Sequence, residues 1–140
     1  MIHQKAPLNL IKELQNKSLE NSENILFLMP CHSIPYYSHI HKNISMKFLT
    51  CKPNLKQLKN YVDEADQFYQ NPKFWLSQEY GFGENKHYLH HIPEYIVLFD
   101  VLYDEIGFML SCCYYKFFKT FHTHFPNDRI GKNALILCKK

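Results

Sequence analysis

The chain has 140 residues, a formal net charge of +3, 46% hydrophobic residues and 16% aromatic residues. This length fits one domain, and so many aromatic residues exclude an intrinsically disordered chain. The lysines are scattered singly, so we expect no nucleic-acid partner. No apolar run reaches the roughly 18–20 residues of a membrane span. The N-terminus "MIHQKAPLNL" lacks the apolar core of a signal peptide, so composition alone predicts a cytosolic chain.

The first third of the chain predicts a helix followed by two strands. Residues 4–20 place Leu10, Ile11 and Leu14 on one face of a short amphipathic helix, and "NKSLENSEN" reads as a linker. We therefore divide the chain into an N-terminal helix and linker, 1–23, and a single α/β domain, 24–140. "ILFLMP" and "MKFLTC" predict strands that prolines end. Between them, Ser33 and Pro35 predict a helix start.

The middle of the chain predicts two short helices with a kink between them. Asp63 and Glu64 suit the first turn of a helix because their charge complements the helix dipole. Asn71-Pro72 then ends one helix and begins the next, as a cap followed by a proline at the first helical position. One apolar stripe runs through both helices: Ala65, Phe68, Tyr69, Pro72, Trp75 and Leu76.

The last third predicts a loop over 81–93, then strand, helix and two strands. The strand is "EYIVLFDVL", the helix is "YDEIGFMLSC", and the last two strands are "YYKFFKTFHTHF" and "KNALILC", joined by the turn "PNDRIG". The fold class that follows is α/β, with a mixed sheet of about five short strands, flanking helices and a terminal β-hairpin.

Cysteines and histidines raise the question of a disulfide or a metal site. The five cysteines form no C-x-x-C motif, and we favour buried thiols over a disulfide or a metal role. His39 and His41, and likewise His122 and His124, would share one face of a strand, with further histidines at 87, 90 and 91. These spacings match no zinc finger, so we favour histidines that bond to loop backbone and expect no metal.

Motifs of other enzyme classes are incomplete. "DEAD" at 63–66 opens a helix, and Gly131-Lys132 lacks the earlier glycine of a phosphate-binding loop. No G-x-S-x-G motif occurs, and acidic residues in the first turn of a helix are more often dipole partners than catalysts. The residues alone predict an α/β domain without a convincing active site.

Four stretches together carry a family resemblance over essentially the whole chain. They are "ILFLMPCHSIPYYSHIH", "MKFLTCKPNL", "YVDEADQFYQNPKFWL" and "FKTFHTHFPNDRIG". They resemble the C-terminal luminal region of the GPI mannosyltransferases that add the third mannose. The first and last stretches are the most specific.

The resemblance implies a polytopic enzyme of the endoplasmic reticulum membrane, acting on the luminal side. It would transfer mannose from dolichol-phosphate-mannose, in α-1,2 linkage, to a GPI-precursor glycolipid, and the donor is a substrate rather than a cofactor. The multi-span membrane core and the acidic catalytic motif of the family are missing here. We therefore expect no catalytic residue in this chain, a fragment inactive alone, and the membrane core as its partner. The sequons at Asn16 and Asn43 fit a luminal location.

Polar and aromatic tips in "PCHSIPYYSHIH" suit sugar stacking and hydroxyl recognition, although the same residues also suit a plain packed turn. The stronger substrate-groove candidates are His32, Ser33, Tyr36, Tyr37 and His39, and the weaker ones are Asp63, Asp66, His122, His124 and Arg129. The competing hypothesis is a non-catalytic soluble binding or scaffold module derived from that domain. A cytosolic metal-binding protein is a third.

Overall fold

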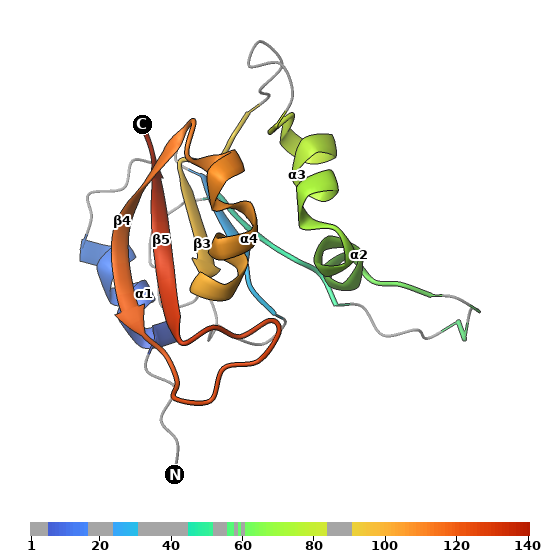
Figure 1. The fold of residues 1–140 in the computed structure, drawn as a ribbon, viewed down its shortest axis with the longest axis horizontal. Coiled ribbons are helices and arrows are strands. Elements are labelled where there is room, and N and C mark those ends of the chain that lie inside the picture. Colours follow the sequence, from blue (N-terminus) through green and yellow to red (C-terminus); the bar gives the residue numbers. More distant parts are fainter. Residues whose placement is uncertain are drawn as a thin grey trace.

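The computed structural model describes residues 6–16, 24–30, 45–51, 56–57, 59, 61–83 and 91–140. Within these residues, five strands form one sheet in the order β2-β1-β3-β5-β4 (Figure 1). The strands are β1 (Asn24–Leu28), β2 (Ser45–Phe48), β3 (Tyr95–Phe99), β4 (Tyr114–Phe121) and β5 (Asn133–Lys139). The first three are parallel, and β5 runs antiparallel to both β3 and β4. The predicted α/β class and its mixed sheet are confirmed.

Helices cover both faces of this sheet. Successive side chains of a strand point to opposite faces, so each central strand contributes to two cores. Ile25 and Val97 face α1 (Ala6–Asn16), which buries Leu10, Ile11 and Leu14 against them. Leu26 and Leu98 face the other way, toward α2 (Glu64–Gln70), α3 (Pro72–Tyr80) and α4 (Asp100–Leu110). The central strands therefore lie in the middle of three layers (Figure 1).

The predicted break between α2 and α3 is confirmed. Asp63 caps α2, since its Oδ1 accepts the backbone N–H of Asp66 at 2.7 Å. Asn71 caps α3, since its Oδ1 accepts the N–H of Phe74 at 3.2 Å, and Pro72 occupies the first turn. Gly81 ends α3 in the left-handed conformation, with φ of 80°.

The predicted strand over 94–102 is too long. β3 ends at Phe99, and α4 begins at Asp100 rather than at Tyr103. The Asp100 carboxylate accepts hydrogen bonds from both the backbone N–H and the side-chain amide of Asn133, each at 3.1 Å. These bonds hold the first turn of the helix beside β5 instead of letting the strand continue.

The predicted terminal hairpin is confirmed, with a shorter first strand. β4 stops at Phe121, so the predicted strand residues 122–125 lie beyond it, and a register shift occurs between Lys116 and Phe118. The connection to β5 contains a turn in which Asn127 Oδ1 accepts the N–H groups of Arg129 and Ile130 at 2.8 Å each. Similarly, β2 stops at Phe48, three residues before the predicted end.

The prediction that the cysteines are buried thiols is wrong for Cys51 and Cys112, whereas Cys113 and Cys138 are thiols packed against the core. Cys51 is exposed and disulfide-bonded. Cys112 is also exposed, while Cys113 and Cys138 are half-buried. Spacing along the chain does not reveal which sulfur atoms meet in space, so the pattern could not distinguish these states. None of the helices in the described ranges is long and apolar enough to cross a membrane.

Candidate functional site

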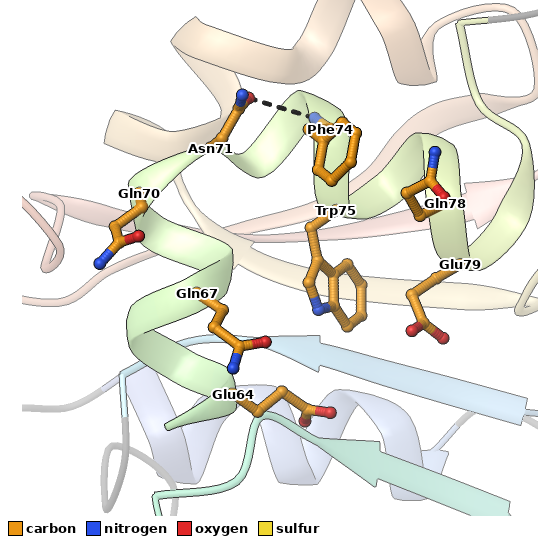
Figure 2. A pocket seen from close by; sticks show the side chains of 8 residues that line it. All are labelled: Glu64, Gln67, Gln70, Asn71, Phe74, Trp75, Gln78 and Glu79. Carbon is orange, nitrogen blue, oxygen red and sulfur yellow. Dashed lines mark hydrogen bonds between the residues drawn. The ribbon is translucent and has the colours of Figure 1, made fainter. Parts of the chain in front are cut away.

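A pocket of about 480 Å³ opens along α2 and α3 (Figure 2). Its described lining combines two aromatic rings, four amide side chains and two carboxylates. The lining residues are Glu64, Gln67, Gln70, Asn71, Phe74, Trp75, Gln78 and Glu79. Ligand pockets in proteins have volumes of roughly 300–1,000 Å³, so this one has room for a small organic group.

Helical spacing gathers these side chains on one side. Glu64 and Gln67 are three residues apart on α2, and Phe74 and Gln78 are four apart on α3, so each pair shares a helix face. The apolar stripe of the same helices faces the sheet, where it buries Ala65 and Phe68. The caps at Asp63 and Asn71 determine where each helix begins. They thereby determine which side chains of the helices point into the pocket.

Trp75 links the pocket to the core and is only 9% exposed. Its ring lies edge-to-face with that of Phe68, with 5.3 Å between the centroids, and Tyr80 contacts it from another side at 6.2 Å. The Lys47 ammonium lies 5.3 Å from the centroid of the indole and 3.4 Å from the Glu79 carboxylate. The indole is thus held by packing and by a cation–π contact.

The rim retains hydrogen-bonding capacity. The Gln70 and Gln78 side chains bond to none of the described residues, and Gln67 uses only its Nε2 group, in a bond to the Val62 carbonyl at 3.1 Å. Glu64 accepts the backbone N–H of Thr50 at 3.1 Å through one carboxylate oxygen. An amide offers both a donor and an acceptor, so this rim suits a neutral ligand that carries hydroxyl groups.

A second cluster brings together two predicted groove residues, Asp66 and Arg129. The Arg129 guanidinium pairs with the Asp66 carboxylate at 3.1 Å and lies 4.6 Å from the centroid of the Tyr69 ring. Both charged side chains are nearly half exposed, so the pair contributes at most about 1 kcal/mol. Burial raises the pKa of Tyr69 and the Arg129 charge opposes that rise, while the Tyr69 hydroxyl meets no hydrogen-bond partner in the described part of the chain.

The other described groove candidates do not converge. Asp63 is occupied as the cap of α2. His122 is 1% exposed, its ring lies tilted against that of Phe99 with 4.8 Å between the ring centroids, and burial lowers its pKa. His124 is exposed and contacts Phe121 at 4.6 Å. The two histidines therefore share no ligand-binding face, and no group of three potential metal ligands occurs in the described ranges.

The remaining candidates lie outside the described residues. They are His32, Ser33, Tyr36, Tyr37, His39 and the sequon residue Asn43. Asn16, the other sequon residue, is the last residue of α1, and its side chain is not described.

The pocket itself was not predicted from the sequence. The prediction for α2 and α3 rested on their apolar stripe and made no statement about the amide side chains of the same helices. A sequence signal that could have indicated the pocket is the recurrence of amide residues at 67, 70, 71 and 78 around the aromatic Phe74. Phe74 is 61% exposed and lies among these amide side chains in the pocket lining.

Comparisons with known proteins find relatives over the whole chain. GPI alpha-1,2-mannosyltransferase 3 of Danio rerio is 38% identical over 100% of this chain, and that of Homo sapiens is 37% identical over 100%. GPI mannosyltransferase 3 of Drosophila melanogaster is 44% identical over 78% of this chain. No protein-family model and no solved structure match.

The match covers only part of each relative. This chain spans 26% of the Danio rerio protein, 25% of the human protein and 20% of the Drosophila protein, in each case in the C-terminal region. The resemblance stated from the four sequence stretches is confirmed in both its identity and its extent.

Proposed function

We propose that this chain, which is similar over its whole length to the C-terminal region of GPI mannosyltransferase 3 proteins, forms the luminal C-terminal part of an endoplasmic reticulum enzyme. The enzyme transfers mannose in α-1,2 linkage from dolichol-phosphate-mannose to a GPI-anchor precursor. The observation that carries this proposal is homology over the full length of the chain to relatives with that name.

The described structure favours a role in assisting the catalytic part of the enzyme over a catalytic role of its own. Three of the described acidic residues are engaged within the domain: Asp63 caps a helix, Asp66 pairs with Arg129, and Asp100 binds Asn133. In this proposal, catalysis belongs to the membrane core of the enzyme. This part packs beside the core and contributes to handling the glycolipid.

The disulfide at Cys51 supports the luminal side. Disulfides persist in the lumen of the endoplasmic reticulum and are rare in the cytosol, where thiol reductants keep cysteines reduced. The sequons at Asn16 and Asn43 agree with the same side, because glycosylation of asparagine occurs there.

A chimera tests the proposal. Cells that lack the enzyme receive the Drosophila relative with its C-terminal region replaced by this chain, and GPI-anchored protein at the cell surface is measured by flow cytometry. We expect restored surface protein from the chimera and none from the membrane core alone or from this chain alone. A chimera that is as abundant as the intact relative but restores nothing would refute the assignment, and it would favour a separate binding module. Transfer of mannose by the purified 140-residue chain alone would refute the supporting role.

A further inference from the structure

We propose that the α2–α3 pocket binds a neutral hexose of the GPI precursor glycan, with Phe74 and Trp75 as the apolar platform and the glutamines of its rim as hydroxyl partners. The inference rests on the proposed function for the identity of the glycan. The chemical class of the ligand is argued from the residues that line the pocket.

The aromatic groups provide the surface that a pyranose ring needs. One face of a hexose in the pyranose form carries mainly C–H groups, and such a face packs against aromatic rings while the hydroxyl groups at the ring edge stay polar. Phe74 lines the pocket and is 61% exposed in all, whereas Trp75 is only 9% exposed. Phe74 is therefore available for stacking, and the accessible edge of Trp75 forms the floor.

The amides provide matching polar contacts. A sugar hydroxyl is both a donor and an acceptor, and so is an amide side chain. Gln70 and Gln78 bond to none of the described residues, and the amide N–H groups of Asn71 remain available because its cap uses only the oxygen. The amides therefore lose no bond to the described protein when a hydroxyl binds.

The charges of the pocket select against a phosphate. Its lining contains the carboxylates of Glu64 and Glu79 and, among described residues, no cationic side chain. Lys47, the nearby cation, already lies 3.4 Å from Glu79 and over the Trp75 ring. An anion would be repelled, so the pocket suits the mannose of the acceptor glycan rather than the phosphate of the lipid donor.

The pocket is also preformed. Its two helices begin at side-chain caps, and Trp75 packs against Phe68 inside the core. A site that needs no ordering on binding loses less of its interaction energy to conformational entropy. The measured affinity for the sugar should therefore reflect its aromatic and hydrogen-bonding contacts, with little free energy lost to ordering the helices.

Trp75 is the single tryptophan of the chain, so its fluorescence reports on the pocket. We would titrate the full 140-residue chain with methyl α-mannopyranoside and, separately, with inorganic phosphate. Saturation-transfer difference NMR would provide an independent measure of sugar binding. We expect saturable binding of the mannoside with a Kd on the order of millimolar, as is typical of a single small ligand with few contacts, and no response to phosphate.

Variants locate the binding site. Phe74→Ala and Gln78→Ala should each weaken mannoside binding by about two- to tenfold, because one aromatic or one hydrogen-bonding contact is lost. Phe108→Ala is the matched control, since Phe108 is 71% exposed on α4 and does not line the pocket. Circular dichroism would establish that all three variants fold.

The glycan site would be overturned by any of three results. The first is no mannoside binding, the second is unchanged binding in both pocket variants, and the third is an equal loss of binding in Phe108→Ala. A response to phosphate that matches the response to mannoside would overturn its charge selectivity. None of these results bears on the chimera, which tests the proposed function without reference to this pocket.

Discussion

Replacing Phe68 with alanine should destabilise the whole domain, because this ring joins α2 and α3 to the sheet. Phe68 is 0% exposed and lies edge-to-face with Tyr69 at 5.1 Å and with Trp75 at 5.3 Å. Truncating a buried phenylalanine costs about 3–5 kcal/mol in the free energy of unfolding. An unfolding entropy of about 2.1 cal/mol/K per residue converts this cost into a fall in Tm of about 10–17 °C for a chain of this length.

The assay is scanning calorimetry of the purified chain with its disulfide kept oxidised. Phe74→Ala serves as the control, because Phe74 is 61% exposed on the neighbouring helix and its truncation should change the free energy of unfolding by about 0.5 kcal/mol or less. A fall in Tm below about 5 °C for Phe68→Ala, or equal falls for both variants, would refute the reasoning that the two helices share the core of the sheet.

Three further results are expected. Tyr114→Phe removes a buried hydrogen bond from the hydroxyl to the Pro93 carbonyl, and urea unfolding should show a loss of about 1–3 kcal/mol; an unchanged midpoint would mean that water replaces the partner. Burial lowers the pKa of His122, so the unfolded chain binds its proton more readily and stability falls as pH drops below the ordinary value of 6.5; this pH dependence should weaken in His122→Gln, and an identical dependence would contradict the assignment. Alkylation followed by peptide mass spectrometry should modify exposed Cys112 in the native chain and Cys51 only after reduction, whereas labelling of Cys51 without reductant would disprove its disulfide.

Local signals in the sequence predicted local structure well. Asn71-Pro72 marked the boundary between α2 and α3, because a side-chain cap and a proline act through neighbouring backbone groups alone. The boundary between β3 and α4 was missed because Val101 and Leu102 continue the apolar run of the strand. What ends the strand is Asp100 bonding to Asn133, a residue 33 positions away, and no local pattern contains that contact.

The candidate site was less predictable than the fold. Asp66 and Arg129 were named separately, but only the folded chain places the loop before β5 against α2. The pocket was missed because exposed glutamines lack the apolar periodicity on which helix analysis depends. The family resemblance was identified from continuous stretches such as "FKTFHTHFPNDRIG". Such a motif can be recognised from the order of its residues alone, without knowing where they lie in the folded chain.

The strand order has a consequence for how the chain is made. β1 lies between β2 and β3, and β5 lies between β3 and β4, so the sheet cannot be completed until residue 139 has been synthesised. At about 5–20 residues per second, the apolar β3, which pairs with β5, waits roughly 2–8 s for its second neighbouring strand. During that interval its side chains can aggregate or be held by a chaperone, and the rate of productive folding depends on which of the two occurs first.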